Sequence, residues 1–178
     1  MQTKVERLRV LFSRDEIAGE VKRLAAEIRR DYEGKTPLLL GVLKGSFIFM
    51  ADLVRALNAP LDVEFIRLSS YGSAKTSSGK VRVVHGLGTS LRGRDVLVVE
   101  DIVDSGLTVS FLIEYVRRHR PASLRVCALI DKKHRRQVPL SVDYVGFDMQ
   151  EGFVVGYGLD FNEKHRYLPD ICVLEEES

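Results

Sequence analysis

The sequence has few cysteines, no long apolar run and a small net charge. Cys127 and Cys172 both lie inside apolar stretches and lack the spacing of a metal site, so we expect two buried thiols in a reducing compartment. No apolar run approaches the ~18 residues of a membrane span, and the charged start, Met1 to Val10, is unlike a signal peptide. These absences predict a cytoplasmic protein with no membrane partner.

The charge balance excludes another class of protein. Lysine and arginine total 27 and aspartate and glutamate 25, which gives a formal net charge of +2. A protein that coats nucleic acid carries a much larger basic excess, so we expect no nucleic-acid partner. The histidines have no paired spacing typical of zinc ligands. Any charge that matters to function must therefore be local.

The apolar content, by contrast, is ample for a folded core. With 178 residues, 45% of them hydrophobic, the chain is long enough for one globular domain, which we expect to span residues 1–178. Ser13 and Glu16 form a capping-box pattern, and apolar residues follow at helical spacing until Glu33, which predicts a helix. The apolar run from Leu38 to Leu43 is too short for a helix and is typical of a strand buried on both faces.

Strand-like and helix-like segments then alternate along the chain. We expect helices at 47–57 and 107–119 and strands at 61–68, 81–84, 96–99 and 124–130. This order predicts an α/β fold with a doubly wound, mainly parallel sheet flanked by helices. Between the second and third strands, residues 69–80 are rich in Ser, Gly and Lys, which predicts a mobile functional loop.

The last part of the chain differs in pattern from the rest. From Val138 onward, short β-like runs at 144–147, 153–157 and 171–174 are separated by Gly, Asp and Asn. We expect a small hood lobe formed mainly by about 138–178 together with the N-terminal segment. Ligands of open α/β sheets bind outside the carboxyl ends of the strands, so a lobe placed there would act as a lid or wall.

Residues 96–108 carry the strongest chemical signal. Four apolar residues lead directly into Glu100 and Asp101, and two adjacent carboxylates at the end of a buried strand are unfavourable unless hydroxyls or a cation meet them. The hydroxyls of Ser105 and Thr108, with backbone N–H groups at a helix start, favour a phosphate, and Gly106 allows close approach. Together these features predict a cradle for a ribose 5-phosphate. The alternative is an acidic surface turn.

The segment from Glu100 to Thr108 resembles the phosphoribosyl-pyrophosphate loop of type I phosphoribosyltransferases. Further stretches resemble the hypoxanthine-guanine branch of that family, in its compact bacterial form: Leu43 to Ser46, Ser70 to Gly72, Asp131 to Lys133, Phe153 to Asp160 and Arg166. The resemblance runs in order from Leu38 to Leu174. It implies a purine-salvage enzyme that transfers the 5-phosphoribosyl group from phosphoribosyl pyrophosphate to N9 of hypoxanthine or guanine, with Mg²⁺.

The resemblance also implies residue roles. Asp104 takes or shares the purine N7 proton, and Glu100 and Asp101 meet the ribose hydroxyls and the metal. The phosphoribosyl group contacts Glu100, Asp101, Asp104, Ser105, Gly106, Leu107 and Thr108. The purine contacts Lys132, Phe153, Val154 and Asp160, of which Lys132 binds the 6-oxygen and Asp160 is also a metal ligand.

Pyrophosphate, in the same family pattern, contacts Lys44, Gly45 and Arg166, and the peptide before Lys44 is cis. Ser70 and Tyr71 match lid residues that exclude water, and the family forms dimers or tetramers. Leu107 stands where some members have a basic residue, which leaves phosphate binding to backbone and hydroxyl donors.

Two alternatives remain open. One is a xanthine-preferring transferase, and the other is a nucleotide-sensing regulator of the same fold that binds RNA. The regulator needs a basic surface, for which 117–120 and 132–136 are the candidates. We expect Lys133, Arg135 and Arg136 to form a solvated basic turn.

Overall fold

The computed structural model describes residues 7–71, 80–150 and 152–175 of the chain. In chain order its elements are β1 (Arg7–Phe12), α1 (Arg14–Asp31), β2 (Leu38–Leu43), α2 (Phe47–Leu57), β3 (Asp62–Tyr71), β4 (Lys80–His85), β5 (Asp95–Val103), α3 (Leu107–Arg118), β6 (Ser123–Asp131), the 3-10 turn η1 (Lys133–Arg135), β7 (Tyr144–Asp148), β8 (Val154–Val155) and β9 (Ile171–Glu175). Within these ranges, no helix has the length and apolar character that a membrane crossing requires.

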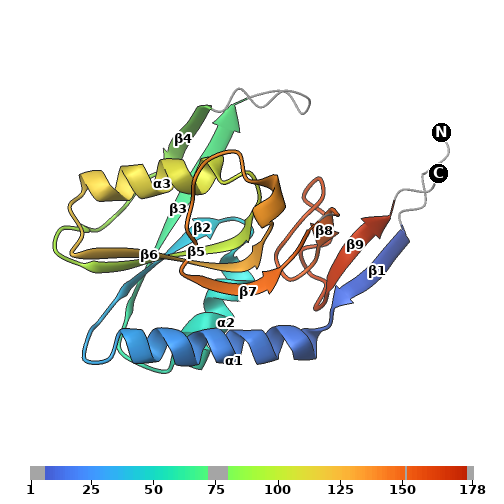
Figure 1. The fold of residues 1–178 in the computed structure, drawn as a ribbon, viewed down its shortest axis with the longest axis horizontal. Helices are drawn as coiled ribbons and strands as arrows, with labels where there is room; N and C mark the ends of the chain where they lie inside the picture. Colours follow the sequence, from blue (N-terminus) through green and yellow to red (C-terminus); the bar gives the residue numbers. More distant parts are fainter. Residues whose placement is uncertain (1–6, 72–79, 151, 176–178) are drawn as a thin grey trace.

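The larger sheet has the strand order β4-β3-β2-β5-β6-β7 (Figure 1). Neighbouring strands from β3 to β7 pair in parallel, and β4 pairs antiparallel with β3. Helices α1 and α2 cover one face of this sheet and α3 covers the other (Figure 1). The predicted doubly wound, mainly parallel α/β fold is confirmed.

Strand β5 shows why a continuous apolar run is needed at the centre of this sheet. Leu97 and Val99 belong to the hydrophobic cluster under α1 and α2, whereas Val96 and Val98 belong to the cluster under α3. Successive side chains of a strand point to opposite faces, so a strand covered on both sides must be apolar at every position. The strand extends further than predicted and includes Glu100 and Asp101.

The helices follow the sequence pattern in one case and depart from it in another. At α1, Ser13 N donates to Glu16 Oε2 at 2.8 Å and Glu16 N donates to Ser13 Oγ at 3.3 Å, which confirms the capping box. At α2, the buried face contains Phe49 and Leu53, while Phe47 is exposed. That helix is apolar around most of its circumference, so spacing alone does not select its buried face.

The smaller sheet, with strand order β1-β9-β8, lies beside the carboxyl ends of β5, β6 and β7 (Figure 1). The sequence pattern did not predict β1 as a strand. The run 144–147, which we expected in the small lobe, is β7 and pairs with β6 in the larger sheet, with Tyr144 opposite Cys127. Tyr144 packs into the core beneath α1, so burial draws this run to the edge of the larger sheet.

Four residues of the expected loop at 69–80 lie in strands instead. Ser69, Ser70 and Tyr71 belong to β3 and Lys80 to β4, and the two strands pair antiparallel at the edge of the sheet. Backbone hydrogen bonds hold an edge strand without requiring apolar side chains, which is why composition alone misled the prediction. The remaining residues of the expected mobile loop, 72–79, lie outside the described part of the chain.

Candidate functional site

The strand order locates the site. The chain runs from β2 through α2 to β3, on one side of the central pair β2 and β5, and from β5 through α3 to β6, on the other side. The loops after β2 and β5 therefore turn away from each other at the carboxyl edge of the sheet, which is where ligands of open α/β sheets bind. A Cβ on Gly45 would lie 1.7 Å from Asp101 Oδ2, so the loop after β2 touches the end of β5 and admits only glycine. A Cβ on Gly158 would lie 2.4 Å from the Gly45 carbonyl oxygen, which brings the segment after β8 to the same edge.

Glu100 and Asp101 form a buried carboxylate pair at this edge. Both side chains are buried, and Glu100 Oε2 has no hydrogen-bond partner within the described structure. Burial, followed by the neighbouring Asp101 charge, raises the pKa of Glu100 well above its ordinary value. Burial also raises the pKa of Asp101 to about 6, although its carboxylate accepts a hydrogen bond of 2.8 Å from Ile102 N. The ionised pair therefore favours a hydroxyl-rich or cationic ligand.

The start of α3 supplies hydrogen-bond donors next to this pair. Gly106 is the N-cap residue, with φ +83°, and no side chain caps the helix, while Leu107 N donates to Ser105 Oγ at 3.4 Å. Backbone N–H groups at a helix start attract anions. A small cavity of about 110 Å³ lies here, lined by Glu100, Ile102, Val103, Asp104, Ser105, Gly106, Thr108 and Val109. The residues predicted to bind ribose 5-phosphate thus share one cavity, apart from Asp101 and Leu107, which flank it.

Asp104 follows β5 and is partly exposed. Its Oδ1 lies 2.9 Å from Arg135 Nε, and its carbonyl oxygen accepts a hydrogen bond of 2.9 Å from Arg136 Nη1. The main chain of Asp104 is thus fixed, while its carboxylate lies toward solvent beside an exposed guanidinium. This arrangement suits a group that exchanges a proton with a bound molecule.

Lys132 lies directly after β6 and is buried, with 3% of its surface exposed. Its Nζ donates to the Gly152 carbonyl oxygen at 2.6 Å, and burial lowers its pKa, opposed by the nearby Asp104 charge. Phe153 is half-exposed and meets Phe161 edge to face, with ring centroids 5.4 Å apart. Lys132 and Phe153 thus lie at the same part of the carboxyl edge of the sheet as Asp104.

Val154 differs from its neighbour Phe153. Its side chain is buried in the core and its strand position faces Val173 of β9. The side chain is therefore not available to a ligand. Only the main chain of Val154 remains a candidate for reading a base edge.

The residues assigned to pyrophosphate form an ion-pair cluster on the other side of the edge. Arg166 Nη2 lies 2.8 Å from Asp160 Oδ1 and 3.3 Å from Glu163 Oε2, and Lys44 Nζ lies 2.9 Å from the same Glu163 oxygen. Lys44, followed by Arg166, lowers the pKa of Glu163. The Leu43–Lys44 peptide bond is cis, as the resemblance implies. The Arg166 charge also reaches Asp101, which joins this cluster to the carboxylate pair.

Candidate metal ligands are present but do not form a complete metal site. Both oxygens of Asp160 are engaged, Oδ1 with Arg166 and Oδ2 with the backbone N–H of Glu163 at 2.8 Å. Among the described residues, no group of three or more His, Cys, Asp or Glu side chains could hold a metal ion alone. A metal here would therefore need further ligands from a bound molecule or from water.

The predicted lid residues are placed only in part. Ser70 and Tyr71 form the end of β3, where their backbones pair with Val81 and Lys80 of β4. The segment that follows them, 72–79, lies outside the described residues. The assignment of a lid thus stays a prediction.

Arg136 is a residue whose role the sequence did not reveal. We expected a solvated basic turn, but the Arg136 guanidinium pairs with the buried Asp131 and donates to the Asp104 carbonyl oxygen. A Cβ on Gly106 would lie 2.9 Å from Arg136 Cδ, so the arginine also packs against the phosphate cradle. The feature of the sequence that could have indicated this role of Arg136 is Asp131, because an aspartate at the end of a buried strand requires a partner. Lys133 and Arg135 are exposed, as predicted.

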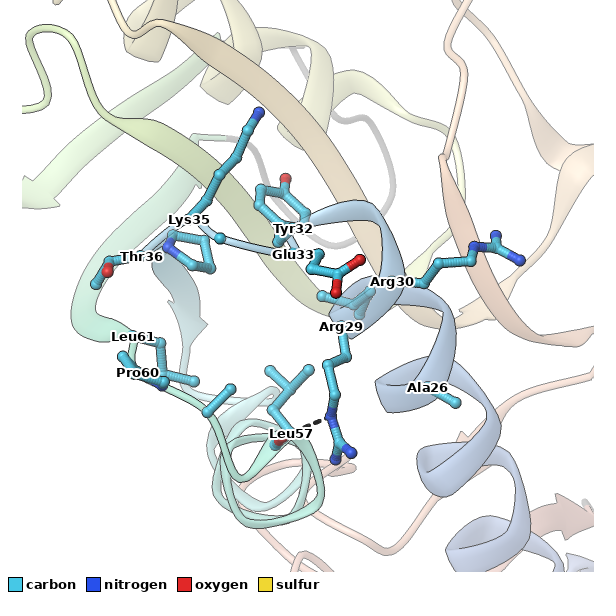
Figure 2. A pocket seen from close by; sticks show the side chains of 14 residues that line it. Ala26, Arg29, Arg30, Tyr32, Glu33, Lys35, Thr36, Leu57, Pro60 and Leu61 are labelled. Atoms are coloured by element: carbon cyan, nitrogen blue, oxygen red, sulfur yellow. Dashed lines mark hydrogen bonds between the residues drawn. The ribbon is translucent and has the colours of Figure 1, made fainter.

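A larger cavity lies elsewhere in the described structure. It has a volume of about 710 Å³ and lies at the opposite end of the sheet, between the C-terminal ends of α1 and α2 (Figure 2). Arg29 points across it and donates to the Leu57 carbonyl oxygen at 3.0 Å (Figure 2). None of the predicted site residues lines this cavity. Size alone therefore does not identify the functional site.

Comparison with known proteins identifies the family of the chain. Residues 11–162 match the family model of the phosphoribosyl transferase domain. The chain is 46% identical to the hypoxanthine-guanine phosphoribosyltransferase of Bacillus subtilis, over 94% of this chain and 93% of that protein. It is 45% identical to the enzyme of the same name from Dictyostelium discoideum, over 94% of this chain and 96% of that protein. A crystal structure of a hypoxanthine-guanine phosphoribosyltransferase from Bacillus anthracis has a TM-score of 0.91 and 42% identity, over 95% of this chain and 100% of that chain.

The buried ion pair gives a stability prediction. Replacing Arg136 with Met should destabilise the protein by about 3–5 kcal/mol in urea unfolding, because it leaves the buried Asp131 carboxylate without its partner. The matched control is Lys133→Met, which breaks an exposed ion pair of 3.3 Å with Asp148 and should cost less than about 1 kcal/mol. Similar losses in the two variants would contradict the special role of Arg136.

The carboxylate pair gives a pH prediction for the ligand-free, metal-free protein. The pKa of Asp101 is about 6 when folded and 3.8 ordinarily, so the folded state holds this proton more tightly. Its contribution to the free energy of unfolding therefore falls as pH rises from about 4 to about 6 and stays low above that. Asp101→Asn should stabilise the protein at pH 7.5 by up to about 3 kcal/mol and have little effect at pH 4. Asp148→Asn is the exposed control, and a pH-independent effect of Asp101→Asn would refute the raised pKa.

Proposed function

The chain belongs to the phosphoribosyl transferase domain family, and on that basis we propose that it transfers the 5-phosphoribosyl group of phosphoribosyl pyrophosphate to N9 of hypoxanthine or guanine. The products are inosine or guanosine monophosphate and pyrophosphate, which makes the protein an enzyme of purine salvage. The observation that carries the proposal is the buried pair Glu100 and Asp101 directly beside the donor-rich start of α3. Such a pair suits ribose hydroxyls, and such a helix start suits the 5-phosphate.

The purine would lie between Lys132, Asp104 and Phe153. The Lys132 ammonium has three protons and gives one to Gly152, so it keeps donors for a 6-oxo group. A 6-amino group would place donors against that ammonium, which disfavours adenine. The half-exposed Phe153 ring offers a face for stacking, and the Val154 main chain would read the base edge.

Asp104 would handle the proton of the purine. As N9 forms its bond to the anomeric carbon of ribose, the carbon–oxygen bond to pyrophosphate breaks and the purine becomes positively charged. A carboxylate within hydrogen-bond reach of N7 stabilises that charge and accepts the proton. Arg136 fixes the main chain of Asp104, so the backbone that carries the carboxylate is already in place before the base binds.

The leaving pyrophosphate would lie against Lys44, Gly45 and Arg166. The charges of Lys44 and Arg166, together with the backbone at Gly45, would meet the negative charge that develops as the bond breaks. Glu100, Asp101 and Asp160 fit Mg²⁺ because they provide hard oxygen donors, including the unpartnered Glu100 Oε2. When bound with the substrate, Mg²⁺ supplies further positive charge to the pyrophosphate oxygens.

Further parts of the proposal concern the surroundings of the site. Ser70 and Tyr71 would belong to a lid that keeps water from the activated ribose. The protein would act in the cytoplasm as a dimer or tetramer. In a solved relative from Trypanosoma cruzi, 43% identical with a TM-score of 0.89, the C-terminal region has a role in the oligomeric state.

The charge pattern argues against an RNA-binding regulator. In 132–136, one of the two candidate basic segments, Lys133 pairs with Asp148, Arg135 with Asp104 and Arg136 with Asp131. These cations are already matched by carboxylates, so the segment offers little net charge to a phosphate backbone. A xanthine-preferring transferase uses the same chemistry and differs only in the base.

The base preference is tested by a substrate panel. Purified protein is incubated with phosphoribosyl pyrophosphate, Mg²⁺ and each of hypoxanthine, guanine, xanthine, adenine and uracil, and the nucleotide formed is quantified. We expect product from hypoxanthine and guanine and little from adenine, because the proposal assigns Lys132 as a donor to a 6-oxo group. Dominant use of xanthine would support the alternative base. Turnover of uracil alone, or of no base, would reject the proposed function.

The proton-handling role is tested at Asp104. Asp104→Asn should lower kcat at least about tenfold, since an amide cannot accept the proton. The dissociation constant for phosphoribosyl pyrophosphate should change by less than about twofold, because the ribose and phosphate contacts remain. Asp148→Asn, an exposed aspartate at the end of β7, serves as the control and should keep full activity. Full activity in Asp104→Asn would remove Asp104 from the mechanism.

A further inference from the structure

Glu163 has no part in the function proposed above, yet it contacts two of the residues assigned to pyrophosphate. A single carboxylate oxygen, Oε2, lies 2.9 Å from Lys44 Nζ and 3.3 Å from Arg166 Nη2. Lys44 follows β2, and Arg166 lies in the loop between β8 and β9, so Glu163 joins cations from two separate parts of the chain. One anionic oxygen shared by two cations is also how an oxygen of a bound pyrophosphate would be held.

The fold does not depend on this carboxylate for the position of Arg166. Arg166 also pairs with Asp160 at 2.8 Å and donates to the Gly158 carbonyl oxygen at 2.7 Å. Glu163 is 64% exposed at its side chain. Its φ of +63° follows from its place in the turn between Phe161 and Lys164, whose backbones pair with each other. An exposed glutamate is thus placed against two cations that have another use.

We propose that Glu163 is an internal competitor for pyrophosphate, whose carboxylate occupies Lys44 and Arg166 until pyrophosphate or the pyrophosphate group of the substrate displaces it. This inference rests on the proposed function, because it takes Lys44 and Arg166 as the pyrophosphate contacts. Each binding event then exchanges one anion for another at the same two cations. The carboxylate therefore weakens the binding of pyrophosphate and returns to the cations when the product leaves.

The size of the effect follows from the exposure of the pairs. Exposed ion pairs contribute little free energy in water, so displacing this carboxylate should change affinity only about two- to fivefold. Because the contacts are exposed, the effect should also shrink as ionic strength rises. A change in the hypoxanthine KM is not expected, because among the described residues the Glu163 carboxylate contacts Lys44 and Arg166 only, and the bond from Glu163 to Asp160 comes from the backbone N–H, which the substitution keeps.

The test is Glu163→Gln, which removes the charge and keeps the shape of the side chain. The inhibition constant of pyrophosphate as a product inhibitor, and its dissociation constant by calorimetry in the presence of Mg²⁺, should both fall about two- to fivefold relative to the parent. Glu33→Gln is the matched control, because it removes the same charge from an exposed glutamate after α1, and it should leave both constants unchanged. The difference between Glu163→Gln and the parent should be smaller at 0.5 M salt than at about 0.05 M.

Arg166→Gln, measured in parallel, separates a failure of the competitor role from a failure of the assigned pyrophosphate contacts. If Arg166→Gln weakens pyrophosphate binding and Glu163→Gln strengthens it, the competitor role is supported. If Arg166→Gln weakens binding but Glu163→Gln leaves it unchanged or weakens it too, the pyrophosphate contacts stand and the competitor role is overturned. If Arg166→Gln leaves pyrophosphate affinity unchanged, the assignment of the pyrophosphate contacts fails, and the competitor role fails with it.

Discussion

The burial of two adjacent carboxylates at the end of β5 constrains the rest of the site. Glu100 and Asp101 cannot move toward water, because β5 is packed on both faces by the hydrophobic clusters under the helices. The loops packed against them must therefore leave room for the two carboxylates. The loop after β2 approaches so closely that only glycine fits at position 45, and the segment after β8 approaches that loop with glycine at position 158. Three separate parts of the chain thus meet at the carboxylates.

A second constraint ties the start of α3, the proposed phosphate cradle, to the end of β6, where the base is proposed to bind. Asp131 ends β6, and its pairing with Arg136 brings the basic turn back against Gly106 and the Asp104 carbonyl oxygen. Lys132 N donates to the Val103 carbonyl oxygen at 2.9 Å, so the end of β6 is also bonded to the end of β5. The position of the Lys132 ammonium relative to Asp104 is thus set by backbone and buried contacts rather than by flexible side chains.

The sequence predicted those features that depend on local pattern. The capping box at Ser13, the central strands and the motif from Glu100 to Thr108 are all encoded within short segments. Two features that depend on long-range pairing were missed. Residues 144–147 pair with β6 because of burial beneath α1, and residues 7–12, which were expected in the hood lobe but not as a strand, pair with β9 from the far end of the chain. Neither partner can be read from a strand-like run alone.

The charged side chains of the site form two kinds of ion pair, exposed and buried. The chain is nearly neutral overall, and four cations of the site have a carboxylate partner: Lys44 with Glu163, Arg166 with Asp160, Arg135 with Asp104 and Arg136 with Asp131. The exposed pairs differ in kind from the buried one. A buried pair such as Arg136–Asp131 is strongly destabilised when one partner is lost, so it keeps its geometry when a ligand arrives. An exposed pair such as Lys44–Glu163 separates at small cost, so it can exchange its carboxylate for a phosphate oxygen. A site built from both kinds holds its backbone rigid while its exposed cations change partners, and this explains how a nearly neutral protein can accept a highly anionic substrate.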